Sequence, residues 1–324
     1  MAVAASLLRA PAIATRYRNR HALSFLPKHS IFPALQYRLP SFSFSCFASV
    51  ASYLSHVELE QIQVLVHGRE LAIVQPRDVD NILDMYINQG RLDGDPYWCR
   101  IWPSAIALAE EMLKNTRFVA NLRVCDLGSG LGLAGVSALL AGARQVVFYD
   151  QEPLALFCSL LTVHANVPHA TTNLPSLVQQ MFPDSSPEYI ESLAYGLALS
   201  PEIFELRSSH KGMALMARAE VFDWSKKEMD MRSFDTVLAS DVLYEKGSLP
   251  YIAAILPNLI RSGSGKVIMT DPTYRTPQNR EEFLGLLCSE VPDMKGLKLE
   301  RMDNVKLQSN DKTEDVELMH FCST

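Results

Sequence analysis

Residues 124–150 read VCDLGSGLGLAGVSALLAGARQVVFYD, and this stretch decides how the rest of the chain is interpreted. Two short apolar runs flank a glycine-rich turn and an apolar helical pattern, which is typical of a strand–helix–strand unit. The glycines fit two fingerprints. Gly128, Gly130 and Gly132 give G-x-G-x-G, and the frame from Gly130 to Gly135 gives the dinucleotide fingerprint G-x-G-x-x-G. The loop is therefore predicted to hold a cofactor, either a nucleotide pyrophosphate or a ligand without phosphate.

Asp126 favours the second kind of ligand. It ends the first strand just ahead of Gly128, where a carboxylate would repel a pyrophosphate at the helix N-terminus. S-adenosylmethionine carries an ammonium and a sulfonium group and no phosphate, so a carboxylate there suits it. The alternative for Asp126 is an aspartate that caps the turn. Asp150 ends the second strand and is expected to accept hydrogen bonds from ribose hydroxyls, which both kinds of cofactor have.

The pattern around this unit predicts one α/β domain. Strands and helices alternate from residue 122 onward, which indicates a Rossmann-like, seven-stranded, mostly parallel sheet with helices on both faces. The last two strands, near 298–303 and 315–321, are expected to be antiparallel. An N-terminal hairpin over 57–75 and a helix over 77–87 extend the domain. A further helix is expected to begin near Pro103.

Two segments do not fit this alternation. Residues 168–211 form a long interruption with helical patterns, so we expect a helical insertion there. The first 57 residues contain no acidic residue and six Arg or Lys, and they are rich in Ser, Ala and Phe. This composition is typical of an organelle transit peptide, with a disordered basic tail as the alternative. We therefore assign residues 1–52 to a chloroplast or mitochondrial transit peptide and 53–324 to the enzyme domain.

Composition limits the partners. The 324-residue chain has a formal net charge of −6, and leaving out the first 57 residues leaves 24 basic and 36 acidic residues, or −12. An acidic body is a poor non-specific nucleic-acid binder, so no nucleic-acid partner is expected. No apolar run has the length of a membrane span. The six cysteines form no C-x-x-C pair and the histidines have no ligand spacing, so no metal site is predicted.

Three motifs together resemble a known family. DLGSGLGLAG resembles motif I of the seven-β-strand S-adenosylmethionine-dependent methyltransferases. YWCRIWPSAIALAE upstream and DVLYE downstream resemble the DxxY branch, whose members are mostly protein lysine methyltransferases. The resemblance runs from about residue 57 to 324, apart from the interruption at 168–211. It implies a protein substrate with an acceptor lysine.

The resemblance carries cofactor roles onto further residues. Trp102 matches a tryptophan beside the cofactor, where an indole can shield the sulfonium from water. Asp223 and Trp224, in VFDW after the third strand, match positions where a carboxylate accepts from the adenine amino group and an aromatic ring covers the base. The alternatives are a core tryptophan for Trp102, a turn aspartate for Asp223 and a buried ring for Trp224.

The residues that name the branch are Asp241 and Tyr244, and we predict that they are catalytic. Asp241 ends the fourth strand, so it is expected to face the transferred methyl group and to hold the acceptor ammonium by a charge-assisted bond. Tyr244 would orient the nitrogen or wall the pocket. The alternatives are a helix cap for Asp241 and a core ring for Tyr244. The segment 271–275, DPTYR, is expected on the same rim, as a substrate channel or as a simple turn.

Three functions remain open from the sequence. A protein lysine N-methyltransferase in an organelle is the leading interpretation. A methyltransferase that acts on another protein side chain or on a small molecule is the first alternative. The second alternative is an NAD-dependent oxidoreductase that uses the overlapping G-x-G-x-x-G frame, and Asp126 and DVLYE argue against it. The sequence names neither the substrate protein nor the oligomeric state.

Overall fold

The computed structural model describes most of the predicted enzyme domain. The described residues are 57, 59–91, 94–167, 170–174, 176–177, 215–226, 233–288, 296–309 and 312–323. The predicted transit peptide and nearly all of the predicted insertion lie outside them. Among the described residues, no helix is long and apolar enough to span a membrane.

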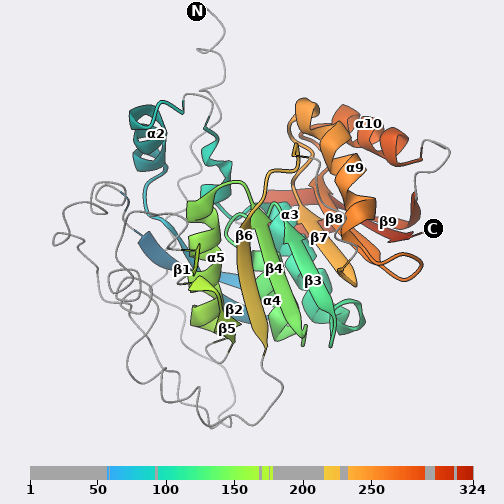
Figure 1. The fold of residues 1–324 in the computed structure, drawn as a ribbon, viewed down its shortest axis with the longest axis horizontal. Helices are drawn as coiled ribbons and strands as arrows, with labels where there is room; N and C mark the ends of the chain where they lie inside the picture. The colour runs from blue at the N-terminus through green and yellow to red at the C-terminus, as the bar shows by residue number, and fades with distance from the viewer. Residues whose placement is uncertain are drawn as a thin grey trace, which may run out of the picture. The chain divides into compact units, whose positions relative to one another are not determined.

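The domain is built on one eight-stranded sheet with the order β5-β6-β4-β3-β7-β8-β10-β9 (Figure 1). The strands from β5 to β8 are parallel, whereas β10 is antiparallel to both β8 and β9. The bounds are β3 Arg123–Leu127, β4 Gln145–Asp150, β5 Thr171–Thr172, β6 Met216–Val221, β7 Thr236–Ser240, β8 Lys266–Pro272, β9 Leu297–Ser309 and β10 Lys312–Ser323. The predicted α/β fold and its mostly parallel sheet are confirmed. The eighth strand is the two-residue β5 at the sheet edge.

Helices cover both faces of the sheet, as predicted. One apolar cluster joins one face of the strands to α3, α4 and α5, and a second joins the opposite face to α9 and α10. Side chains alternate between the two clusters along β3, since Val124 belongs to the first and Cys125 to the second. The helices are α3 Pro103–Lys114, α4 Leu133–Leu140, α5 Pro153–Asn166, α9 Leu249–Leu259 and α10 Pro277–Cys288.

The N-terminal extension is a separate hairpin, β1 Leu59–Val66 and β2 Arg69–Pro76, followed by helix α2 Val79–Asn88. Asn166 and Thr162 of α5 attach it, because their side chains hydrogen-bond to backbone groups of β2. In Figure 1 the hairpin lies beside α5, on the other side of the sheet from α9 and α10. Three single-turn 3-10 helices complete the described elements: η1 Pro96–Cys99, η2 Thr116–Phe118 and η3 Lys246–Ser248.

Candidate active site

A cavity of about 380 Å³ lies at the carboxyl ends of β3, β4, β6 and β7, which is where open parallel sheets bind ligands. The segment from α2 to the start of α3 closes its other side. Eight of the ten predicted site residues line it: Trp102, Gly128, Gly130, Asp150, Asp223, Trp224, Asp241 and Tyr244. The structure thus brings together residues that are more than 140 positions apart in the sequence.

The glycine-rich loop forms one wall through its backbone. Gly128, Gly130 and Gly132 all have positive φ, which residues other than glycine rarely adopt. A Cβ atom on Gly128 would lie 2.9 Å from Cγ1 of Val242 and 3.3 Å from Cζ3 of Trp224. The indole therefore packs directly on the loop backbone and leaves no room for a side chain at Gly128.

Two predicted residues, Asp126 and Gly132, do not line the cavity. The Asp126 side chain is buried, and its Oδ2 accepts a hydrogen bond of 2.8 Å from the Gly135 amide in the first turn of α4. Burial raises the pKa of this carboxyl to about 7. Asp126 thus holds the loop onto the helix, and its position gives no support to direct selection of a cationic ligand.

Asp150 also fixes the loop but remains at the cavity wall. Its Oδ2 accepts from the Gly130 amide and its Oδ1 from the Glu152 amide, both at 2.9 Å. Burial raises the pKa of Asp150 to about 6 against the effect of these two hydrogen bonds. A carboxylate has about four acceptor sites, so Asp150 can still accept from a ligand hydroxyl.

Asp223 and Trp224 line the same cavity after β6. The Oδ1 atom of Asp223 accepts from both the amide and the hydroxyl of Ser225, and its Oδ2 lies 3.3 Å from Nζ of Lys226. The hydrogen bonds from Ser225 and the contact with Lys226 lower the pKa of Asp223. Asp223 therefore caps its own turn, as expected for a turn aspartate, and it also lines the cavity.

Asp241 occupies an unusual backbone position at the end of β7. Its φ is +57°, a left-handed conformation that is costly for a residue with a side chain, and such strain clusters at functional sites. Its Oδ1 accepts a 2.9 Å hydrogen bond from Nη1 of Arg275. Burial raises the pKa of Asp241 to about 6 although the Arg275 charge lowers it. The prediction that 271–275 lies on the same rim is borne out by Arg275, which also lines the cavity.

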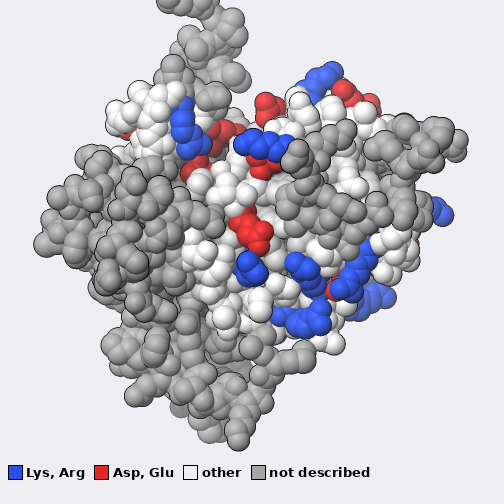
Figure 2. Space-filling view, viewed as in Figure 1, with Lys and Arg blue, Asp and Glu red and all other residues white. Residues whose placement is uncertain are grey.

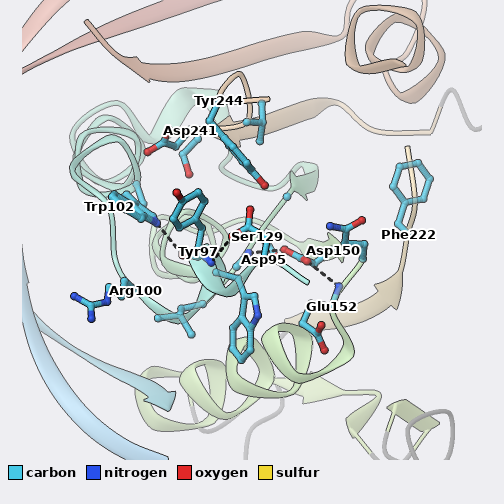
Figure 3. Close-up of a pocket in the computed structure, with 18 of the residues that line it drawn as sticks. Asp95, Tyr97, Arg100, Trp102, Ser129, Asp150, Glu152, Phe222, Asp241 and Tyr244 are labelled. Carbon is cyan, nitrogen blue, oxygen red and sulfur yellow. Dashed lines mark hydrogen bonds between the residues drawn. The ribbon is translucent and has the colours of Figure 1, made fainter. Parts of the chain in front are cut away.

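Aromatic rings gather around Asp241 (Figure 3). The ring of Tyr97 meets those of Trp102 and Tyr244 edge-on, with centroids 5.7 Å apart in both pairs. The Trp102 indole donates to the Tyr97 carbonyl at 2.8 Å, and Tyr244 hydrogen-bonds to Asp95. Burial and the neighbouring Asp95 carboxylate raise the pKa of Tyr244, so its hydroxyl stays protonated. This part of the cavity is a carboxylate surrounded by rings, which suits a cation.

A second polar network in the cavity was not predicted from the sequence. Glu152 is buried, and its Oε2 accepts from the Tyr86 hydroxyl at 2.8 Å and from Arg91 at 2.9 Å. The Trp98 indole in turn donates to the Tyr86 oxygen at 2.7 Å. These contacts tie the N-terminal segment to the start of α5. No local motif marks them, because the partners are 61 and 66 residues apart in sequence.

Metal ligands do not cluster in the described part of the chain: no three His, Cys, Asp or Glu side chains there are grouped to hold an ion. That no metal takes part stays a prediction. On the face shown in Figure 2, charges of both signs lie near the upper end, and basic side chains gather at the lower right. The absence of a nucleic-acid partner likewise stays a prediction.

Comparison with known families adds to this geometry. Residues 204–290 match the family model described as lysine methyltransferase. The resemblance to the lysine methyltransferases is therefore confirmed, and the matched range contains Asp223, Asp241, Tyr244 and Arg275. It covers about a quarter of the chain.

Curated relatives carry one recurring name, electron transfer flavoprotein beta subunit lysine methyltransferase. The chain is 37% identical to the Danio rerio protein over 84 residues, 44% identical to the Xenopus laevis protein over 62 residues and 36% identical to the Homo sapiens protein over 72 residues. These matches cover 25%, 19% and 22% of this chain, and 33%, 25% and 28% of those relatives. The chain thus matches a third or less of their length. Among solved structures, a TehB-like SAM-dependent methyltransferase from Corynebacterium glutamicum aligns over 76% of this chain and 98% of its own, with 14% identity and a TM-score of 0.39.

Proposed function

We propose that this protein is an S-adenosylmethionine-dependent protein lysine N-methyltransferase. The observation that carries the proposal is that Asp241 and Tyr244, from the stretch that matches lysine methyltransferases, share one cavity with the glycine-rich loop. The cofactor would supply an electrophilic methyl group on its sulfonium. Gly128, Asp150 and Trp224 would hold its adenosine, and Asp241 with the rings of Tyr97, Trp102 and Tyr244 would form the acceptor side.

The residues present fit this cofactor. Trp224 packs against Gly128 and also lines the cavity, so its ring offers an apolar wall for the base. Asp150 ends the neighbouring strand and keeps acceptor capacity for the ribose hydroxyls. Asp126 holds the glycine-rich loop onto α4 through its hydrogen bond from the Gly135 amide. The Trp102 ring lies on the Asp241 side, where it can exclude water from the reacting nitrogen.

The acceptor lysine must arrive at a site that attracts its ammonium, release one proton to solvent, and then be held as the neutral amine. The buried carboxylate of Asp241 provides the attraction, and the rings of Tyr97, Trp102 and Tyr244 provide a wall that displaces water. Tyr244 stays protonated and its hydroxyl is held by Asp95, so its fixed ring can orient the nitrogen. Positioning of this kind, and not strong acid–base chemistry, is the part we assign to the chain.

The cofactor is tested first by thermal unfolding with S-adenosylhomocysteine and, separately, with NAD. A ligand at 100 times its dissociation constant stabilises the fold by about 2.7 kcal/mol, which is easily measured. We expect a shift with S-adenosylhomocysteine and none with NAD. A shift with NAD alone would overturn the proposal in favour of an oxidoreductase.

The substrate is tested by radioactive methyl transfer to the beta subunit of electron transfer flavoprotein, the protein named in the relatives' description. Label on lysine supports the proposal, and label on another side chain or on a small molecule supports the alternative methyltransferases. We expect Asp241→Asn to lower the transfer rate by about ten- to a hundredfold, because one charge-assisted bond is lost. Affinity for S-adenosylhomocysteine should change little. Tyr244→Phe should follow the same pattern more mildly.

We further propose that the protein works in an organelle. The acid-free composition of residues 1–52 supports this. The test is a fusion of that segment to a fluorescent protein. Import into the chloroplast or the mitochondrion supports the proposal and identifies the compartment, and a cytosolic signal contradicts it.

A further inference from the structure

Arg275 is the charged residue nearest to Asp241 that the proposed chemistry leaves without a role. It lies in the turn between β8 and α10, and its guanidinium contacts two groups of the acceptor side. Nη1 lies 2.9 Å from Oδ1 of Asp241, and the guanidinium carbon lies 4.3 Å from the centre of the Trp102 ring. The side chain is 24% exposed, so this cation is largely enclosed.

The two oxygens of Asp241 differ. Oδ1 accepts from Arg275, while Oδ2 is buried and has no hydrogen-bond partner in the described part of the protein. A buried carboxylate oxygen without a partner is costly, and such atoms in native structures call for a ligand or a role. The oxygen belongs to a residue that lines the cavity.

The charges around Asp241 are mostly of its own sign. Asp271 and Glu314 both raise its pKa, and Arg275 is the cation that opposes them. Asp271 is itself paired with Arg280, whose Nη1 lies 2.6 Å from its Oδ2. Tyr274, which precedes Arg275, hydrogen-bonds to Glu314. Burial and two neighbouring acids would therefore leave Asp241 largely protonated near neutral pH if Arg275 were absent.

We propose that Arg275 is a positioning residue that divides the carboxylate of Asp241 into a held oxygen and a receiving oxygen. Oδ1 stays on the guanidinium, and Oδ2 receives the acceptor ammonium. Stacking on Trp102 fixes the guanidinium, and the guanidinium in turn fixes the carboxylate plane. This inference rests on the proposed function for the identity of the acceptor, whereas the coupling between Arg275 and Asp241 is independent of it.

A matched control lies at the other end of the same strand. Asp235 precedes β7 and pairs with Arg261, with 2.6 Å between Nη1 and Oδ1, while Asp241 follows β7. Neither Arg261 nor Asp235 lines the cavity. Arg261→Gln therefore removes an Arg–Asp pair and one charge without touching the acceptor side.

The first measurement needs no substrate. The carboxyl carbon of Asp241 is titrated by NMR in protein labelled with ¹³C aspartate, with Asp241→Asn to assign the signal. We expect Arg275→Gln to raise the midpoint by about 1 to 3 pH units, because an adjacent arginine lowers a carboxyl pKa by that amount. Arg275→Lys should raise it less, and Arg261→Gln should leave it unchanged. An unchanged midpoint in folded Arg275→Gln overturns the proposal, and if that variant does not fold, the same criterion applies to Arg275→Lys.

The second measurement uses methyl transfer to the beta subunit. At pH 7 Arg275→Gln should raise KM for the protein substrate at least about tenfold, while affinity for S-adenosylhomocysteine stays within about twofold. Raising the pH to 9 should lower the KM of Arg275→Gln most of the way back to the wild-type value, since Asp241 ionises again. A KM defect that persists at pH 9 contradicts the positioning role. If the wild type neither binds S-adenosylhomocysteine nor transfers methyl, the proposed function fails, and the titration still decides whether Arg275 controls Asp241.

Discussion

The glycine-rich loop and the segment from Asp95 to Trp102 form opposite walls of one cavity, and they are built in different ways. The loop is held by its backbone: its glycines take positive φ angles, and amides bond to Asp126 and Asp150. The opposite segment is held by side chains: the Trp98 indole donates to Tyr86, whose hydroxyl donates to Glu152, 66 residues away in sequence. The backbone of the loop is therefore tested by substitutions that add a side chain to a glycine. The side-chain network is tested by substitutions that remove hydrogen bonds.

The largest effect is expected in the loop, from Gly132→Ala. A Cβ atom there would lie 2.9 Å from Cβ of Ser159 and 3.1 Å from Cε1 of Phe148, and φ is +77°. Overpacking costs about 1–3 kcal/mol and the left-handed backbone about 1–2 kcal/mol, so we expect the free energy of unfolding to fall by about 2–5 kcal/mol. Urea denaturation measures it.

Gly130→Ala is the matched control, because its Cβ would lie no closer than 3.6 Å to the Trp98 carbonyl oxygen. It should cost about 1–2 kcal/mol, from the backbone alone. Equal losses in the two variants would show that packing behind the loop does not separate these glycines.

The next effect is expected where the opposite segment is anchored, from Glu152→Gln, because Trp98 hydrogen-bonds to Tyr86 and Tyr86 to Glu152. This change removes the buried charge that accepts from Tyr86 and Arg91. Hydrogen bonds to a charged group contribute about 1.5–3 kcal/mol, and we expect a loss of that order in the free energy of unfolding.

Arg91→Gln should cost less, about 1 kcal/mol or below, since the Arg91 side chain is 39% exposed and water replaces it. A larger loss for Arg91→Gln than for Glu152→Gln in the same urea titration would mean that the arginine, and not the buried carboxylate, holds this wall.

The smallest effect is a pH dependence that belongs to the loop. The pKa of Asp126 is raised to about 7 in the folded protein, above its ordinary value, so the folded state binds a proton that the unfolded state has released. Stability from this group is full at low pH and is lost as pH rises through about 7. Between pH 6 and 8 we expect the wild type to lose about 1 kcal/mol more than Asp126→Asn, whose amide oxygen still accepts from Gly135. Identical losses in thermal or urea unfolding would mean that Asp126 is not protonated in the folded state.

The sequence predicted the parallel core well because each buried strand is a short apolar run between turn signals, and β3, β4, β7 and β8 are all of this kind. It missed β5, since two residues of edge pairing leave no periodicity. It also placed the last two strands too short. β10 pairs with β9 from Lys312 to Ser323 but with β8 only from Val316 to Cys322, so the pair extends beyond the sheet.

The site shows the same division. The glycine fingerprint, the strand-end aspartates and the family resemblance together named eight residues that line the cavity. They did not indicate that Asp126 accepts from the amide of Gly135, nine residues ahead. They left Arg275 as a rim residue without a partner and gave no hint of Glu152. Such pairings depend on which strand ends meet in space, and a single sequence does not record that.

The strand order has a consequence for synthesis on the ribosome. β10 is made after β9 yet lies between β9 and β8. When β9 emerges it has no place to add to, because the edge of β8 is reserved for a strand not yet translated. The nascent domain therefore exposes the β8 edge until β10 arrives, and sheet closure is a late, non-local event of the kind that is slow and prone to wrong pairing. Nε2 of His320 on β10 lies 3.4 Å from Oε1 of Glu111 on α3. The insertion of β10 therefore also completes the packing of the helix whose N-terminal cap is Trp102.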